Sequence, residues 1–252
     1  MAVPDPRSLV GYAPLVVRPT TIILCGGRGT RAYPHTVEVP KPLLDVAGRP
    51  IVRHVMDIYA AQGFTDFVLA AGYGADHVED FARTVPGDWK VNVVDTGEDT
   101  NKGDRVLAVR HLVSGTFFVT YGDGVGNVDL AALLELHNSH DGWATVTTVP
   151  LPSQYGTVET DGSGRVQGFL EKPRLVDHWI NAGFMVMDGS VFEGWAGDLE
   201  DDVLPALAQA HKLYAYRHHG FWMSMDTYKD SIDLDAIARR SLEEHGNPPW
   251  LA

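Results

Sequence analysis

The chain has 252 residues and a formal net charge of -13, a size that fits one large α/β domain or two small ones with a buried core. The negative charge argues against partners that bind through the attraction of a basic protein for polyanions, so we expect no nucleic-acid and no membrane partner. Cys25 is the single cysteine, which excludes an intramolecular disulfide and a Cys-rich zinc site and makes a reducing, cytoplasmic location the simplest interpretation.

Residues 1–19 read as an irregular lead-in with two early prolines and no apolar stretch of signal-peptide length. From residue 20 onward, short apolar runs alternate with segments of helical spacing. We predict strands at 20–25, 67–71, 91–94 and 116–121, and helices at 51–62, 75–83, 105–112 and 129–139. This alternation predicts an α/β fold with a Rossmann-like, mostly parallel sheet that helices flank on both faces.

After residue 143 the pattern changes to strands joined by short links. We predict strands at 144–149, 156–159, 166–170, 182–187 and 213–216, and helices at 203–210 and 232–240. No clear linker separates the two parts of the chain. We therefore expect a single domain over 20–252, in which the second half (144–252) extends the sheet of the first half (20–143).

A glycine-rich loop follows the first predicted strand. Residues 26–31 read Gly-Gly-Arg-Gly-Thr-Arg, and Lys41 follows between two prolines. Glycines let the backbone approach a ligand closely, while Arg31 and Lys41 add positive charge where phosphates would lie. The loop is not a Walker A sequence, because it lacks the Gly-Lys-Ser/Thr ending of that motif. It is not a dinucleotide fingerprint either, because Ala32 stands where the last glycine should be. Although a purely structural turn is the alternative, the added cations favour a triphosphate site.

Two aspartates are candidate ligands of a divalent cation. Asp123 lies between two glycines after the strand 116–121, at the sheet edge where α/β proteins bind ligands. Asp226 precedes Thr227 in the C-terminal part of the chain. Each alone is equally consistent with a turn or helix cap. Two carboxylates together with phosphates suit Mg²⁺, which keeps several of its waters.

Two further motifs adjoin predicted strands of the second half. Glu171-Lys172-Pro173 follows one strand, and Asn181-Ala182-Gly183 opens the next. Each alone could be a surface turn.

Six motifs in fixed order give the chain a resemblance to a known family. They are GGRGTR at 26–31, PKP at 40–42, YGDG at 121–124, EKP at 171–173, NAGF at 181–184 and MDT at 225–227. From Thr21 to Trp250 the sequence resembles the sugar-1-phosphate nucleotidyltransferases, which implies their glycosyltransferase-A-like fold. The stretch from Val94 through Arg105 is similar to the cytidylyl-transferring branch. Asp104 departs from that branch, which has a glycine there, and the segment from Arg83 to Asp95 is shorter.

The resemblance implies an enzyme that converts CTP and a sugar 1-phosphate, with α-D-glucose 1-phosphate as the expected sugar, to CDP-sugar and pyrophosphate. It implies Mg²⁺ as cofactor and a homo-oligomer. The catalytic residues would be Arg31, Lys41, Asp123 and Lys172, and the metal ligands Asp123 and Asp226. The nucleotide would contact Leu24, Cys25, Gly26, Gly27, Arg28, Gly29, Thr30, Arg31, Lys41, Thr100, Arg105 and Gly122. The sugar phosphate would contact Gly156, Glu171, Lys172 and Asn181.

Arg105 is the predicted base reader. Its guanidinium can donate to the O2 or N3 acceptors of cytosine, whereas uracil would present its own N3–H donor. Three alternatives remain open: dTTP, UTP or a different phosphorylated substrate in the same chemistry; a non-catalytic sensor of nucleotide sugars; and a nicotinamide dehydrogenase. The missing third glycine disfavours the last of these.

Overall fold

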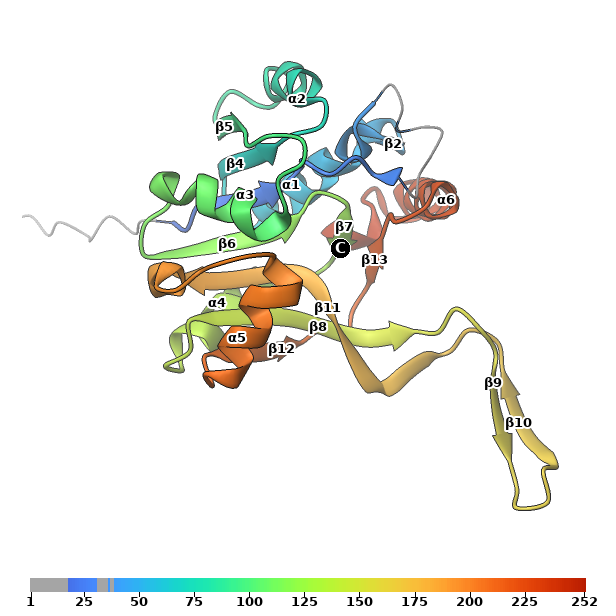
Figure 1. The fold of residues 1–252 in the computed structure, drawn as a ribbon. Coiled ribbons are helices and arrows are strands. Elements are labelled where there is room, and N and C mark those ends of the chain that lie inside the picture. The colour runs from blue at the N-terminus through green and yellow to red at the C-terminus, as the bar shows by residue number, and fades with distance from the viewer. Residues whose placement is uncertain (1–17, 31–35, 37–38) are drawn as a thin grey trace, which may run out of the picture.

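The computed structural model describes residues 18–30, 36 and 39–252 (Figure 1). Its centre is a seven-stranded sheet with the strand order β12-β8-β11-β6-β1-β4-β5. The bounds of these strands are β1 (Thr21–Leu24), β4 (Asp66–Ala71), β5 (Lys90–Asp95), β6 (Thr116–Tyr121), β8 (Ala144–Pro152), β11 (Arg174–Asp188) and β12 (Leu213–Arg217). β6, β1, β4 and β5 are parallel, and β11 pairs antiparallel with both β6 and β8. The predicted mostly parallel, mixed α/β sheet is confirmed, and strands of both halves share it.

Six α-helices of the described chain lie around this sheet: α1 (Ile51–Ala61), α2 (Ala75–Ala82), α3 (Lys102–Ala108), α4 (Leu130–Asn138), α5 (Leu204–Gln209) and α6 (Tyr228–His245). A π-helical turn at Leu199–Val203 leads into α5, and 3-10 turns lie at Lys41–Leu43, Arg110–Leu112, Gly189–Phe192 and Pro249–Leu251. Short two-stranded pairs are formed by β2 (Asp45–Val46) with β3 (Arg49–Pro50), β7 (Gly124–Gly126) with β13 (Trp222–Ser224), and β9 (Thr157–Thr160) with β10 (Val166–Leu170). No helix within the described ranges has the length and hydropathy needed to cross a bilayer.

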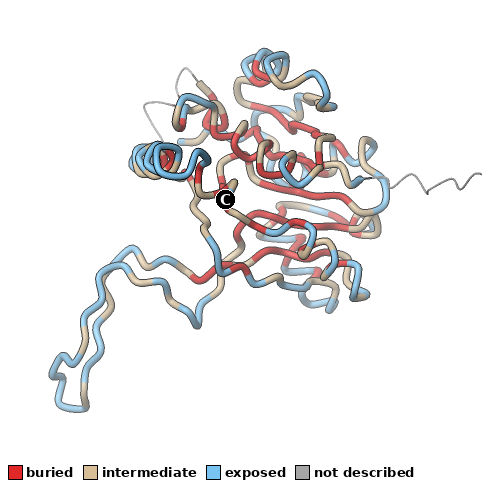
Figure 2. The backbone as a smooth tube through the Cα atoms, turned by 180° about the vertical axis from the view of Figure 1, so that it is seen from behind, coloured by how far each residue is buried: buried red, intermediate tan, exposed pale blue. Residues whose placement is uncertain are grey.

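The core has two layers, one on each face of the sheet, because side chains of a strand alternate between its faces. Ile23 of β1 belongs to a buried cluster that includes residues of α1, α2, α4 and α6, whereas Ile22 belongs to a second cluster that includes residues of α3 and α5. β1, β4, β6 and β8 are accordingly buried along most of their length (Figure 2). Each fully buried large aliphatic or aromatic side chain contributes about 1.5–3 kcal/mol, so this double layer fixes the strand ends that carry the site.

Several elements differ in extent from their predictions for local reasons. α3 begins at Lys102 rather than at the predicted 105, because the Asn101 side chain accepts a hydrogen bond from the Asp104 amide at 2.8 Å and caps the helix. α6 is longer than 232–240, because Thr227 and Asp230 form a capping box at its start. β11 begins at Arg174, eight residues before the predicted 182, because it continues to pair with β8 across register irregularities. β7 and β13 were not predicted.

β9 and β10 form a hairpin that projects away from the body of the molecule (Figures 1 and 2). They pair only with each other, and the hairpin is largely exposed. Its exposed apolar side chains are Val158, Val166, Phe169 and Leu170.

Candidate functional site

A cavity of about 810 Å³ opens at the carboxyl edge of the parallel strands. The loops after β1 and β5 form part of its wall, and Gly122 and Asp123 after β6 form another. The second half of the chain contributes Asn181 from β11, Glu200 from the π-helical turn and Asp226 from the start of α6. The cavity therefore lies where the two halves meet, as ligand sites of open α/β sheets do.

Most of the predicted nucleotide and metal residues line this cavity. They are Leu24, Gly26, Gly27, Arg28, Gly29, Thr30, Lys41, Thr100, Arg105, Gly122, Asp123 and Asp226. Arg31 lies outside the described residues. Cys25 is not among the lining residues and is only 1% exposed within the core, so its predicted contact with the nucleotide stays a prediction. Burial raises the pKa of the Cys25 thiol, which suits an inert core side chain.

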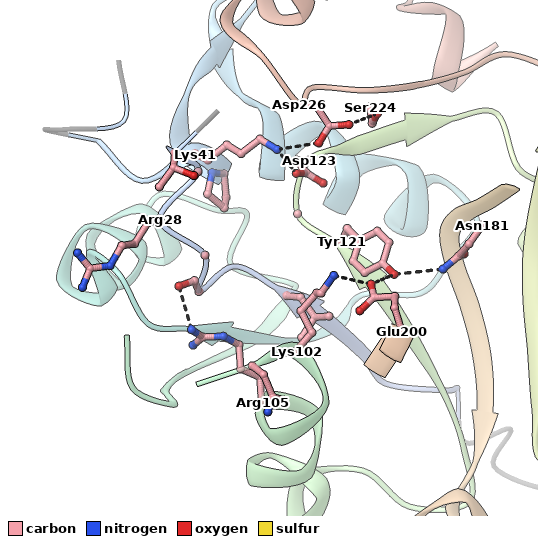
Figure 3. A pocket seen from close by; sticks show the side chains of 18 of the residues that line it. Arg28, Lys41, Lys102, Arg105, Tyr121, Asp123, Asn181, Glu200, Ser224 and Asp226 are labelled. Carbon is pink, nitrogen blue, oxygen red and sulfur yellow. Dashed lines mark hydrogen bonds and ion pairs between the residues drawn. The ribbon is translucent and has the colours of Figure 1, made fainter. Parts of the chain in front are cut away.

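Lys41 lies between the two predicted metal ligands. Its Nζ is 2.5 Å from Asp123 Oδ2 and 3.5 Å from Asp226 Oδ1, although the three residues come from distant parts of the sequence (Figure 3). The Lys41 residue is 8% exposed, and Ser224 donates a hydrogen bond to Asp226 Oδ2 at 3.0 Å. The side chains thus form a compact group in which a buried ammonium meets two partly exposed carboxylates.

The residues of this group fit a divalent cation. Within the part of the chain that the structure describes, no group of three or more His, Cys, Asp or Glu side chains could hold a metal ion. Asp123 and Asp226 nevertheless converge on one positive charge, the Lys41 ammonium. Mg²⁺ is usually held by one or two carboxylates with substrate phosphates and waters, so two converging aspartates suffice when a nucleotide supplies the remaining oxygens.

The backbone of the glycine loop is held by the side chains behind it. A Cβ on Gly26 would lie 2.0 Å from Arg105 Nη1, so any other residue would displace the guanidinium. Gly29 has φ +61° and would place a Cβ 2.7 Å from Lys41 Cβ. These two positions require glycine because Arg105 and Lys41 pack directly against the loop.

Arg105 lines the cavity, but its terminal nitrogens donate to protein oxygens. Nη1 donates to the Ala71 carbonyl at 2.9 Å and to Thr96 Oγ1 at 2.6 Å, and Nη2 donates to the carbonyls of Gly26 at 3.0 Å and Glu98 at 2.9 Å. Arg105 is only 3% exposed, and its desolvation lowers the pKa of its guanidinium. In this conformation Arg105 joins the loops after β1, β4 and β5 rather than presenting free terminal donors to a base.

A second polar group in the cavity was not predicted. Glu200 Oε1 lies 2.7 Å from Lys102 Nζ and accepts a hydrogen bond from the Tyr121 hydroxyl, which in turn accepts one from Asn181 Nδ2 at 3.1 Å (Figure 3). Burial and the neighbouring Glu200 raise the pKa of Tyr121, so its hydroxyl remains a donor. Glu200 stands in the run Glu-Asp-Asp, which in sequence is typical of a solvated helix start. Of this group, the sequence had placed only Asn181 in the predicted sugar-phosphate site, and Tyr121 stood at the end of a predicted strand beside it.

Three of the four predicted sugar-phosphate residues lie elsewhere. Asn181 lines the cavity, whereas Gly156, Glu171 and Lys172 do not. They flank the projecting hairpin, and the Glu171 and Lys172 side chains are exposed. Lys172 thus lies outside the lining of the cavity of its own chain, and its role in binding the sugar phosphate stays a prediction.

Comparison with known proteins shows which family and which relatives the chain resembles. Residues 20–236 match the family described as "Nucleotidyl transferase". The chain is 33% identical to the glucose-1-phosphate cytidylyltransferase of Salmonella typhi, over 91% of this chain and 97% of that protein. It is 35% identical to mannose-1-phosphate guanylyltransferase 1 of Arabidopsis thaliana, over 87% of this chain and 66% of that protein.

Among solved structures, HddC from Yersinia pseudotuberculosis in complex with GMP-PN has a TM-score of 0.67. It is 23% identical, and the match covers 87% of this chain and 99% of that chain. At this identity the likeness concerns the fold.

Proposed function

Because this chain belongs to the nucleotidyl transferase family, we propose that it transfers a cytidylyl group from CTP to a sugar 1-phosphate, with α-D-glucose 1-phosphate as the expected acceptor. The observation that carries the proposal is the convergence of Lys41, Asp123 and Asp226 in a cavity walled by the glycine loop. The choice of CTP is supported by the Salmonella typhi relative, which aligns over nearly the whole chain. The Arabidopsis thaliana relative shows that such an alignment also extends to guanylyl transfer, so the base has to be tested directly.

The proposed reaction is an in-line displacement. An oxygen of the sugar phosphate attacks the α-phosphorus of CTP, a new P–O bond forms, and the bond to the β-phosphate oxygen breaks with loss of pyrophosphate. The second pKa of a phosphate is about 6, so the nucleophile is already anionic near neutral pH and no general base is required. The residues of the cavity then contribute positioning and charge neutralisation.

The charges of the cavity determine how the phosphates would be held. Lys41 would neutralise the reacting phosphate, and the backbone N–H groups of the glycine loop would cradle the rest of the triphosphate. Asp123 and Asp226 would hold Mg²⁺, which neutralises phosphate charge and keeps attacking and leaving oxygens aligned. Lys41 is paired with both aspartates in the unliganded structure. If Lys41 turns to the phosphate when the nucleotide binds, the two carboxylates lose this partner and would face a polyanion. Mg²⁺ would then replace Lys41 as their positive partner.

The position of Lys172 leads us to propose a homo-oligomer. Lys172 flanks an exposed apolar hairpin and lies outside the cavity of its own chain. A second copy of the chain that packs against the hairpin would cover Val158, Val166 and Phe169 and could receive Lys172 and Glu171 at its own cavity. Hydrophobic burial would stabilise such a contact, and the second lysine would complete the sugar-phosphate site.

The test is product detection by mass spectrometry with CTP, dTTP, UTP and GTP, each combined with a set of sugar 1-phosphates and Mg²⁺. We expect CDP-sugar and pyrophosphate in equal amounts, with CTP preferred by at least about tenfold in kcat/KM. Faster turnover with a nucleotide other than CTP would show that the transferred group is not cytidylyl. Binding of CDP-glucose without turnover of any pair would identify a sensor instead of an enzyme.

A further inference from the structure

Arg28 connects two loops that wall the cavity. It is the third residue of the glycine loop, and its Nη2 lies 3.0 Å from Glu98 Oε1 and 3.5 Å from Asp99 Oδ1 in the loop after β5. All three residues line the cavity, and Figure 3 shows the Arg28 side chain on the side of the pocket away from Lys102 and Glu200. The cation therefore belongs to the glycine loop, whereas its two carboxylate partners belong to a different wall.

The carboxylates that hold Arg28 stand on a fixed backbone. The Glu98 carbonyl accepts a hydrogen bond from Arg105 Nη2 at 2.9 Å, and the Gly97 amide donates to Asp95 Oδ1 at 2.9 Å. Neither of these contacts involves the Glu98 carboxylate. The carboxylate can therefore release Arg28 by rotation of its own side chain, without a rearrangement of the loop.

The ion pairs of Arg28 are weak enough to be exchanged. The side chains of Arg28, Glu98 and Asp99 are 53%, 41% and 93% exposed, and a pair with such exposure shifts an equilibrium by about fivefold at most. A triphosphate carries several negative charges, and its oxygens can bind a guanidinium bidentately. A ligand that needs Arg28 loses affinity in proportion to the fraction of molecules in which the two carboxylates hold it.

We propose that Glu98 and Asp99 compete with the terminal phosphates of the nucleotide for Arg28 and so set the affinity of the site for them. Arg28 turns from the carboxylates to the β- and γ-phosphates when the nucleotide binds. The carboxylates take Arg28 back when pyrophosphate leaves, which weakens the hold of the cavity on this product. This inference rests on the proposed function, since it concerns the nucleotide and the pyrophosphate of the same reaction.

The experiment measures dissociation constants by calorimetry in the presence of Mg²⁺. The ligands are pyrophosphate, a non-hydrolysable analogue of the nucleotide that wild type turns over, and the matching nucleoside monophosphate. We expect Glu98→Gln/Asp99→Asn to bind the analogue and pyrophosphate about three- to fivefold more tightly than wild type, with the monophosphate unchanged. Arg28→Ala should weaken both ligands, and the Glu98 and Asp99 changes should give no gain when they are added to Arg28→Ala.

A matched control separates competition for Arg28 from the general effect of removing two negative charges. Glu79 and Asp80 form exposed ion pairs with Arg83 around α2, and none of these three residues lines the cavity. Glu79→Gln/Asp80→Asn therefore changes the net charge equally at a comparable group of one arginine and two carboxylates. We expect this variant to bind all three ligands as wild type does.

Unchanged or weaker binding of the analogue in Glu98→Gln/Asp99→Asn would overturn the competition while leaving the transferase intact. The same conclusion follows if the control variant gains as much, or if the gain persists in the Arg28→Ala background. Wild-type protein that turns over no nucleotide would overturn the proposed function and this inference with it. Thermal unfolding of every variant within a few degrees of wild type separates these outcomes from loss of folding.

Discussion

Individual side chains in the cavity already have partners, and ligand binding has to exchange them. Lys41 bonds to the two aspartates, Lys102 to Glu200, and Arg28 to Glu98 and Asp99. Each of these cations would be attracted to phosphate, and each carboxylate left behind would require a new partner. A divalent cation would supply that partner for Asp123 and Asp226 and would offset part of the repulsion between a triphosphate and a chain of net charge -13.

Arg105 gives a prediction at this scale. Arg105→Ala removes four hydrogen bonds that join the loops around the cavity, although the Ala71 and Gly26 carbonyls keep backbone donors. We expect about 3 kcal/mol of lost unfolding free energy in urea denaturation and a higher KM for every nucleotide tested. A loss of discrimination between CTP and UTP at unchanged stability would instead support direct base reading.

The sequence predicted the positions of some cavity residues and not the contacts of others. The resemblance implied that Lys41, Asp123 and Asp226 share one site, and the position of Asp123 after a strand placed that site at the sheet edge. The partners of Arg105 are mostly backbone carbonyls, which no residue pattern reveals. Glu200 was missed because an acidic run before a helix normally faces water, and only the packing of its turn against α3 brings it to the cavity.

At the scale of elements, α6 positions a candidate metal ligand. Asp226 immediately precedes the helix cap, and its amide donates to Asp230 Oδ2 at 3.0 Å. The same carboxylate oxygen accepts from the Thr227 amide at 2.7 Å and the Thr227 hydroxyl at 2.8 Å. The capping box therefore stabilises the helix and fixes the backbone of Asp226 at the same time.

Asp230→Ala should consequently affect both properties. We expect a loss of about 1 kcal/mol in unfolding free energy, together with a severalfold higher Mg²⁺ concentration at half-maximal activity. Asp233→Ala, which removes an exposed ion pair of the same helix, is the control and should change neither by much. An unchanged Mg²⁺ requirement in Asp230→Ala would mean that the cap has no part in positioning Asp226.

The prediction of elements from sequence was best where hydrophobic periodicity was strong. β6, whose four central residues are buried, has the predicted bounds, and so does β10, although β10 is exposed and pairs only with β9. β7 and β13 escaped prediction, since each has three residues and is defined only by pairing with the other. The direction of the β9–β10 hairpin also depends on what it packs against, which its own sequence does not encode.

For the whole molecule, the open question is whether one chain is sufficient for catalysis. Its cavity contains Asp123 and Asp226, whereas Lys172 stands outside it beside the hairpin. Net negative charge on each copy favours dissociation, so the apolar hairpin would have to supply the attraction between copies. We therefore expect an assembly in which each site combines residues of two chains.

A complementation experiment tests that assembly. Lys172→Ala and Asp123→Asn should each reduce turnover by about a hundredfold or more. When the two variants are expressed together, shared sites should restore about a quarter of wild-type activity, because half the dimers are mixed and each contains one complete site. No recovery in demonstrably mixed assemblies would show that Lys172 serves its own chain or has no part in the reaction.

The most direct test of the central claim is a crystal structure with Mn²⁺ and a non-hydrolysable CTP analogue. We predict an anomalous peak within coordination distance of both Asp123 and Asp226. The triphosphate should lie along the glycine loop, and Lys41 Nζ should donate to a phosphate oxygen. A nucleotide bound elsewhere, or a metal that contacts neither aspartate while Lys41 keeps its present partners, would contradict it.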